Sequence, residues 1–403
     1  MESNTLRIGI SADWHIEPGM RQQRIRALNR LVAGVGERKP DLFLLPGDLF
    51  DHESTPEDRW ALAGILENLA EHCPVYGCEG NHEQHDDLAV FNYVTNRERS
   101  HHVRIWTQPA GILPGTAHIE RLPGGQRVGI LACPWFDKAN VGAHLPAEEA
   151  RPEAVRLETI NAAETMLRCF YAEAQRVKQM KATPIFIGHL MVAGSDTSTG
   201  QRLIGQTVEL APAAVAGVGA AFHGLGHIHL RQGWLDNRVL YPGSPDRITA
   251  GETDEKSWTL IEIETTEPFA IRSVEHIPLP SPAIHKVEID MAAGEDLQGR
   301  LRELASTVLR GDHIRVRILR RPDQADSVNT GEIEADLRRI FLPTSLKVAT
   351  EVQRAERAVR SDRIVGARGL EEKLEALWET EGGIASHLSR ETVLTNAAEL
   401  QRG

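Results

Sequence analysis

Cysteine is scarce in this sequence, with four residues among 403: Cys73, Cys78, Cys133 and Cys169. So few cysteines over this length do not make a disulfide framework. Cys73 and Cys78 flank one apolar run and Cys133 ends another, which favours small buried side chains over a metal or redox pair. We therefore expect the protein in the cytoplasm.

Long apolar runs are also missing. No uninterrupted run approaches the ~20 residues that a membrane-spanning helix needs. The first residues, MESNTLRIGISADWH, have neither the basic nor the long apolar segment of a signal peptide. There is no internal repeat or low-complexity tract. These absences predict a globular chain with no membrane segment, and its length suits two or three domains.

Positive charge is in short supply, since 45 Lys and Arg face 57 Asp and Glu for a net charge of −12. Taken alone, this argues against non-specific binding of nucleic acid. The charge is uneven, however, because residues 285–368 carry 16 Lys and Arg against 14 Asp and Glu, a net +2. Carboxylates that bind metal also make bulk charge a poor guide to the field at a site.

Short apolar runs alternate with helical patterns in the first two-thirds of the chain. The predicted strands are Leu6–Ser11, Asp41–Pro46, Pro74–Cys78, Val128–Cys133, Thr183–Gly188, Ala220–Gly226 and Ser257–Glu264. The predicted helices are Gln22–Glu37, Glu57–Glu71 and Val155–Lys181. Several strands are apolar on both faces, as expected when helices or a second sheet cover each side. The pattern predicts a layered α/β domain over residues 1–279.

The tract PLPSP at residues 278–282 predicts a linker to a smaller α+β unit, residues 280–345, which Pro343 ends. Its predicted elements are strands at His285–Met291 and His313–Leu319 and helices at Leu297–Leu309 and Ile333–Ile340. Residues 346–403 are predicted to be helical, with helices at Thr350–Val359, Leu370–Trp378 and Thr392–Leu400. The second of these presents an apolar stripe of Leu370, Leu374, Leu377 and Trp378, which needs a partner surface.

Five short polar motifs stand at the ends of predicted strands of the large domain. They are Asp13-Trp14-His15, Gly47-Asp48, Gly80-Asn81-His82, Gly188-His189 and Gly226-His227-Ile228-His229. Ligand sites of open α/β sheets lie beyond the carboxyl ends of strands. Each motif alone has an ordinary reading as a turn or a packed histidine. Their joint occurrence in one domain predicts a functional site.

The residue types of these motifs favour a two-metal phosphoesterase. Two metal ions about 3.5–4 Å apart neutralise the charge of a phosphate ester, activate a water and hold the attacking and leaving oxygens. Such a pair needs a carboxylate between the ions, and Asp48 is the candidate. The many imidazoles favour Mn²⁺, Fe or Zn²⁺ over Mg²⁺ or Ca²⁺.

The series D-x-H, GD-x-x-D, GNH, GH and GHxH over residues 6–265 resembles the calcineurin-like metallophosphoesterases. The resemblance implies a β-sandwich flanked by helices. It also implies that one metal ion is held by Asp13, His15, Asp48 and His229, and the second by Asp48, Asn81, His189 and His227. His82 is then the catalytic imidazole, which assists protonation of the leaving oxygen or orients the phosphate.

The tracts ISADWH, LLPGDLFD, GHLMVAGS, GLGHIHL and YPGSP are more similar to the SbcD-type nuclease subunits of DNA-repair complexes. This resemblance implies a Mn²⁺-dependent DNA exonuclease and endonuclease, acting on double- and single-stranded ends. Residues 280–345 are then a capping domain, and residues 346–403 dock on the coiled coil of an SMC-like ATPase, with two copies of each chain in the complex. Two positions depart from the pattern of the family: Glu83 replaces a common Asp, and Asp51 stands where some members have His.

Two other functions remain open at this point. One is a small-molecule phosphodiesterase or phosphatase on the same fold, which would have no need of the last 120 residues or so. The other is a non-catalytic subunit that binds DNA ends or the ATPase, against which stands the presence of every expected ligand and of His82. Cleavage polarity, the metal within the Mn, Fe and Zn group, and the host are left undecided by the sequence.

Overall fold

The computed structural model describes residues 4–84, 86–94, 101–136, 152–197, 201, 208–249, 251–352, 368, 370–381 and 389–400. The chain divides into two compact units, Met1–Ile284 and His285–Gly403. Within the described ranges, no helix has the length and apolar character needed to cross a membrane.

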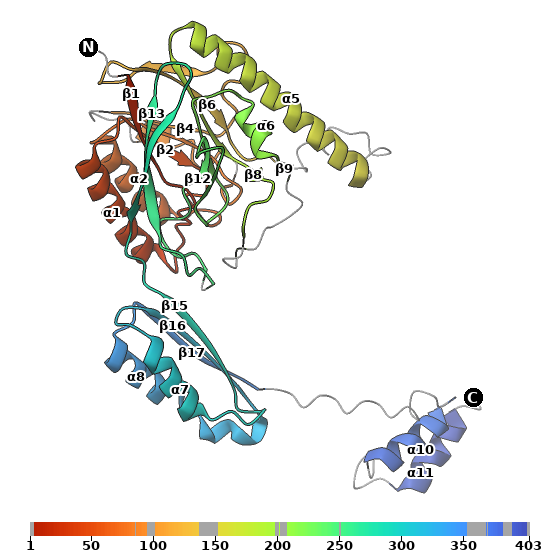
Figure 1. Cartoon of the computed structure of the whole chain (residues 1–403). Coiled ribbons are helices and arrows are strands. Elements are labelled where there is room, and N and C mark those ends of the chain that lie inside the picture. Colours follow the sequence, from red (N-terminus) through yellow and green to blue (C-terminus); the bar gives the residue numbers. More distant parts are fainter. Residues whose placement is uncertain are drawn as a thin grey trace. The chain divides into compact units, whose positions relative to one another are not determined.

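The first unit is built on two six-stranded sheets (Figure 1). The first sheet has the order β14-β13-β1-β2-β3-β4. Strands β1 to β4, from the centre of the sheet to one edge, are parallel. The strands of this sheet are β1 (Thr5–Ile10), β2 (Leu42–Pro46), β3 (Val75–Cys78), β4 (Val103–Trp106), β13 (Ser257–Glu264) and β14 (Ile271–Pro278). Strand β13 pairs antiparallel with both β1 and β14.

The second sheet has the order β11-β12-β10-β7-β6-β5, with β12, β10, β7 and β6 parallel. Its strands are β5 (His118–Arg121), β6 (Arg127–Cys133), β7 (Thr183–His189), β10 (Phe222–Gly226), β11 (Gln232–Trp234) and β12 (Val239–Tyr241). A separate small pair joins β8 (Met191–Val192) to β9 (Glu209–Leu210). The seven strands predicted for this unit are all present, within one or two residues at each end.

Helices cover the outer face of each sheet. They are α1 (Arg21–Arg38), α2 (Pro56–Ala70), α3 (Phe91–Val94), α5 (Pro152–Gln179) and α6 (Pro212–Ala216). Strand β2 shows how the layers form: Phe43 and Leu45 pack among side chains of α1 and α2, while Leu42 and Leu44 face the second sheet. The layers are thus helix, sheet, sheet, helix, which confirms the predicted sandwich flanked by helices and explains the strands that are apolar on both faces.

The start of α2 shows how local sequence fixes a boundary. The Thr55 hydroxyl accepts a hydrogen bond from the Asp58 amide at 3.2 Å, and the Asp58 carboxylate accepts one from the Thr55 amide at 3.0 Å. This reciprocal capping box, with Pro56 in the first turn, satisfies amides that the helix itself leaves unpaired.

The second unit contains a three-stranded sheet with the order β15-β16-β17. Its elements are β15 (Ile284–Asp290), α7 (Leu297–Thr307), β16 (His313–Arg320), the 3-10 helix η1 (Pro322–Ser327), α8 (Thr330–Phe341) and β17 (Ser345–Val352). Both α-helices pack on one face of the sheet, where Leu304, Leu337 and Phe341 meet Ile314 and Val316. The expected small α+β unit is present.

Two boundaries of this unit were predicted wrongly. Strand β17 pairs in parallel with β16 along its whole length, from His313↔Ser345 to Arg320↔Val352, so the sheet extends to Val352 rather than ending near residue 345. The helix predicted from Thr350 is wrong for residues 350–352, which are strand, and the rest of that prediction lies outside the described residues. Pro343 marks only a turn, and the alternation of Leu346 and Val348, which pack on the core, is the strand signal that was missed.

Helices α10 (Leu370–Glu381) and α11 (Arg390–Leu400) confirm the two last predicted helices and pack against each other. Arg390 reaches Glu375 across the pair at 3.5 Å. Leu370 is 41% exposed, while Leu374 and Leu377 are half-buried. The Trp378 side chain and Gly382-Gly383 lie outside the described residues.

Candidate metal centre

The polar motifs meet at one edge of the two sheets. Asp13 and His15 follow β1, Asp48 follows β2, and Asn81 and His82 follow β3. From the second sheet, His189 ends β7, and His227 and His229 follow β10. Because β7 and β10 are parallel and His189 is paired with Gly226, the second sheet delivers its three imidazoles to the same place.

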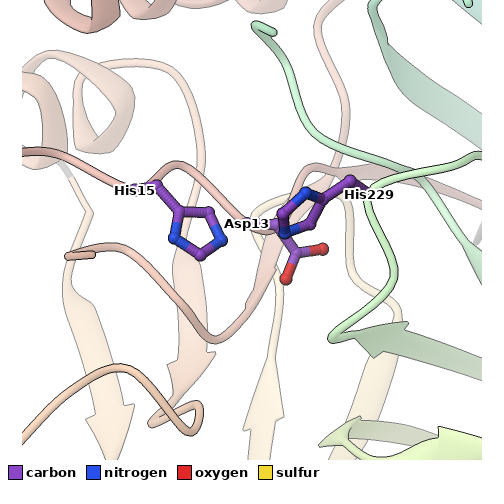
Figure 2. A group of neighbouring side chains, drawn as sticks. All are labelled: Asp13, His15 and His229. Atoms are coloured by element: carbon purple, nitrogen blue, oxygen red, sulfur yellow. The ribbon is translucent and has the colours of Figure 1, made fainter. Parts of the chain in front are cut away.

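The side chains form two groups that share a border at Asp48. Ligand atoms of Asp13, His15 and His229 lie within 4.8 Å of one another, and so do those of Asp48, His189 and His227; the set of His15, Asp48 and His82 overlaps both. Figure 2 shows the first group gathered on the loops that follow the strands. The Asp48 Oδ2 atom lies 3.2 Å from His189 Nε2 in one group and 3.8 Å from His15 Nε2 in the other. This is the position that a bridging carboxylate requires.

Three imidazoles are oriented through their Nδ1 atoms. His15 Nδ1 lies 2.8 Å from Asp51 Oδ1, His189 Nδ1 lies 2.8 Å from the Pro46 carbonyl oxygen, and His229 Nδ1 lies 3.1 Å from Glu252 Oε1. Each partner is an acceptor, so Nδ1 carries the proton and donates it. In the neutral form of such a ring the Nε2 lone pair is available, as in metal-bound histidines whose other nitrogen is tied to a carboxylate or carbonyl.

Several buried atoms at the centre have no hydrogen-bond partner. They are Asp13 Oδ2, His15 Nε2 and His227 Nε2. Asn81 Oδ1 and Asp48 Oδ2 both face His189 Nε2, at 3.0 and 3.2 Å. An unsatisfied buried polar atom costs roughly 1–3 kcal/mol. Buried ligand-type atoms that lack a partner fit a bound cation, so the donor set suits a pair of metal ions.

The charge at the centre favours a cation as well. Burial alone would lower the pKa of His189, but the Asp48 carboxylate beside it outweighs burial and raises that pKa to about 9. Burial raises the pKa of Asp13 to about 6, and burial lowers the pKa of His227 to about 3. The Asp48 carboxylate therefore favours positive charge at this centre, while the His227 imidazole stays neutral.

The backbone at these residues is held in an uncommon conformation. Asp13, His15 and Asp48 have φ of 55°, 46° and 53°, in the left-handed region. Such residues cost of order 1–3 kcal/mol each and cluster at functional sites. Gly80 permits the approach of β3 to Asp48, because a Cβ at this position would lie 2.1 Å from Asp48 Oδ1. Glycine is therefore required at this position.

His82 lies beside both groups, and its role as the catalytic imidazole stays a prediction. Its Nδ1 atom donates to the Asp51 carbonyl oxygen at 2.7 Å, and its amide donates to Asp48 Oδ1 at 2.9 Å. The ring lies edge-on to His15 with centroids 4.6 Å apart, and its side chain is 25% exposed. The Nε2 atom is thus the one left to exchange a proton with a substrate or with solvent.

Glu83 organises the loop around Asp48. Its carboxylate accepts hydrogen bonds from the amides of Asp48 at 3.1 Å, Phe50 at 2.9 Å and Gly80 at 2.6 Å. The longer side chain found here in place of Asp therefore makes three backbone contacts that hold the β2 and β3 loops together.

Sequence reasoning missed three residues that support the predicted ligands. Asp51 orients His15 with its carboxylate and His82 with its carbonyl, and the hydrogen bond from His15 lowers the pKa of Asp51 to about 2. Glu252 orients His229 and is itself held by the buried Lys256 at 2.7 Å. Gln201 accepts from the His229 amide at 3.1 Å and donates to the His227 carbonyl. Only Asp51 carried a signal, the second Asp of GD-x-x-D.

Residues 6–152 match the family model described as calcineurin-like phosphoesterase. The chain carries a calcineurin-like phosphoesterase domain. The match covers the motifs of the first sheet, from Asp13 to His82, while His189, His227 and His229 complete the centre from beyond it.

Similar solved structures are distant in sequence. GAP50, the anchor in the inner membrane complex of Plasmodium, is 11% identical, with a TM-score of 0.38 over 77% of this chain and 96% of its own. The protein TT1561 of Thermus thermophilus is 13% identical, with a TM-score of 0.38 over 68% and 100%. A dimetal phosphatase from Danio rerio is 13% identical, with a TM-score of 0.40 over 68% and 99%. These likenesses carry no conclusion about function.

A calcineurin-like phosphoesterase with this buried Asp and His centre is a metal-dependent hydrolase of phosphate esters. When bound, a pair of metal ions supplies Lewis acidity and an activated water. The chain's own part is to hold imidazoles and carboxylates in fixed orientation. The residues that orient those ligands, such as Asp51 and Glu252, contribute to metal affinity, typically by 10- to 100-fold each.

We predict that protein loaded with manganese as a probe loses the metal from both groups in Asp48→Ala, whereas Asp13→Ala loses it from one. The reason is that Asp48 borders both groups and Asp13 belongs to the first only. Metal analysis of dialysed protein would count the ions, with phosphoesterase activity of Asp48→Ala at background. A full manganese content in Asp48→Ala would contradict the bridging position.

We predict that His82→Ala keeps its metal but hydrolyses phosphodiesters about 10²–10⁴-fold more slowly, the usual contribution of a positioned acid or base. His52→Ala is the matched control, since His52 is 53% exposed and stands beside the same loop. Metal content and kcat measured on the same samples would decide. Loss of one metal equivalent in His82→Ala would make His82 a ligand instead.

Proposed function

We propose that this chain is an SbcD-type nuclease subunit that cuts DNA phosphodiester bonds with two Mn²⁺ ions and works with a coiled-coil ATPase. Metal-dependent phosphoesterase domains act on many kinds of substrate. The proposal that DNA is the substrate therefore rests on the second unit. Imidazole-rich donor sets suit Mn²⁺, Fe or Zn²⁺, and the carboxylates of Asp13 and Asp48 make Mn²⁺ our choice among them.

The observation that carries the proposal is a row of cations on the open face of the small sheet. Arg315 on β16 is the direct neighbour of Lys347 on β17. Strand β15 runs parallel to β16, because residue numbers rise in the same direction along both strands. His285 contacts Asp312 at one end, and the Met291 amide donates to the Leu319 carbonyl oxygen at the other. Lys286 on β15 therefore stands beside Arg315. All three side chains of this cation row (Lys286, Arg315 and Lys347) are exposed.

The next row of the same face is neutralised within the sheet. Arg317 pairs with Glu288 at 2.7 Å and with Glu351 across the strand. The cation row thus stands out against paired charges, and helices α7 and α8 occupy the opposite face. Regularly spaced exposed cations on a flat surface suit the phosphates of a nucleic acid backbone, which dominate non-specific affinity.

The ATPase is proposed as the partner of α10 and α11. Leu370, Leu374 and Leu377 recur at helical spacing on α10, and Leu370 remains 41% exposed beside α11. An exposed apolar residue at the start of such a stripe suits contact with another amphipathic helix, such as a coiled coil. We propose two copies of this chain and two of the ATPase in the complex.

Reversing the cation row tests the DNA proposal. We expect Arg315→Glu and Lys347→Glu to weaken binding to DNA of any sequence. The slope of log K against the logarithm of the salt concentration should become shallower by about 1 for each phosphate that the variant no longer binds. Hydrolysis of a small phosphodiester should be unchanged. Arg302→Glu on α7 is the matched control, because its side chain is 79% exposed on the helical side of the sheet.

Unchanged DNA binding and cutting in Arg315→Glu and Lys347→Glu would remove the support for DNA as substrate. Cleavage of small phosphodiesters without any cleavage of DNA by the wild type would favour a small-molecule phosphodiesterase instead.

Removing residues 368–403 tests the partner proposal, since this cut spares β17. We expect a folded protein that binds metal and cleaves small phosphodiesters at the wild-type rate but no longer binds the ATPase. Pull-down with the ATPase and cutting of duplex DNA with and without ATP would measure this. An insoluble product, or one that still binds the ATPase, would contradict the docking role of α10 and α11.

A further inference from the structure

A second cluster of metal-binding residue types lies where two edge strands of the sandwich meet. His102 directly precedes β4, the edge strand of the first sheet, and His118 and Glu120 stand two apart on β5, the edge strand of the second. Residues two apart on a strand face the same side. One ligand atom from each of the three lies within 4.8 Å of the other two. We propose that His102, His118 and Glu120 form a zinc site that joins the two sheets at this edge.

The three side chains converge on one carboxylate oxygen. Glu120 Oε2 lies 3.1 Å from His102 Nε2 and 3.2 Å from His118 Nε2. Ligands of a tetrahedral zinc ion with bonds of 2.0–2.1 Å are about 3.3 Å apart, so these separations need little change on binding. The set of two imidazoles and one carboxylate also occurs in zinc sites that keep a fourth position for water.

The orientation of His102 separates this cluster from a simple ion pair. Its Nε2 atom is shielded from solvent and has no hydrogen-bond partner, although Glu120 Oε2 is only 3.1 Å away. The contact is therefore an ion pair by distance that lacks the angles of a good hydrogen bond. A buried ring nitrogen that makes no hydrogen bond, with a second imidazole and a carboxylate oxygen within 4.8 Å, is the arrangement that a shared ion needs.

A supporting hydrogen bond holds the carboxylate. The hydroxyl of Tyr76, on β3, donates to Glu120 Oε2 from the core between the sheets. Ligands of metal sites are commonly fixed by such contacts to neighbouring groups. The two imidazoles line a cavity of about 610 Å³, together with Arg104, Trp106 and Tyr93, so an ion can enter from solvent.

Arg104 opposes binding in a way that can be tested. Its Nη1 atom lies 3.3 Å from His118 Nδ1. A guanidinium nitrogen can only donate, so His118 Nδ1 accepts this hydrogen bond and carries no proton. Binding of zinc through His118 Nε2 requires a proton on Nδ1, so the exposed Arg104 side chain must turn away. Loss of this guanidinium should therefore strengthen the site.

The experiment measures zinc bound by the full chain after dialysis against zinc chloride. We expect His102→Gln, His118→Gln and Glu120→Gln each to hold one zinc fewer than the wild type, whatever the wild-type total. His101→Gln is the matched control, since His101 is the neighbouring imidazole outside the cluster, and it should keep the wild-type content. Circular dichroism and hydrolysis of a small phosphodiester should match the wild type in all four.

A variant that should strengthen zinc binding keeps the test independent of any loss of folding in the other variants. Arg104→Ala should release zinc to a chelator more slowly than the wild type. Equal zinc contents in the wild type and in folded His102→Gln and His118→Gln would overturn the proposal, and so would weaker zinc binding in Arg104→Ala.

Discussion

The carboxylate of Asp48 stands between two sets of imidazoles, and the rest of the large unit is arranged around it. Its Oδ2 atom faces His189 at 3.2 Å and His15 at 3.8 Å, while its Oδ1 atom accepts the amide of His82. Around it, Asp13 Oδ2, His15 Nε2 and His227 Nε2 converge as buried atoms that have no hydrogen-bond partner. Such convergence is stable only with positive charge in its midst, which is why the centre suits two cations.

The layered fold makes this convergence possible. Parallel strands from two sheets end at one edge, so β1 and β2 supply the carboxylates of Asp13 and Asp48, β3 supplies Asn81, and β7 and β10 supply imidazoles. Left-handed backbone at Asp13, His15 and Asp48 turns the chain sharply after each strand, and the well-packed layers stabilise this strain. The separate small unit carries the exposed cation row, on which our proposal of DNA as the substrate rests.

Much of the site could be predicted because polar residues at the ends of buried strands are conspicuous in sequence. Asp13, Asp48 and His189 each interrupt an apolar run, and parallel strand ends are known to meet. Glu252 and Gln201 could not be found this way, because they act through hydrogen bonds on residues far along the chain and stand in no repeating pattern. Strand β17 was missed because Pro343 suggested an end, whereas only its pairing with β16 decides its conformation. The metal-binding roles of the individual residues stay predictions.

Crystals of the protein grown with manganese would test the central claim directly, through anomalous diffraction at the manganese absorption edge. The account predicts two peaks, one among Asp13, His15 and His229 and one among Asn81, His189 and His227, with Asp48 in contact with both. A single peak, or two peaks of which Asp48 touches only one, would contradict it.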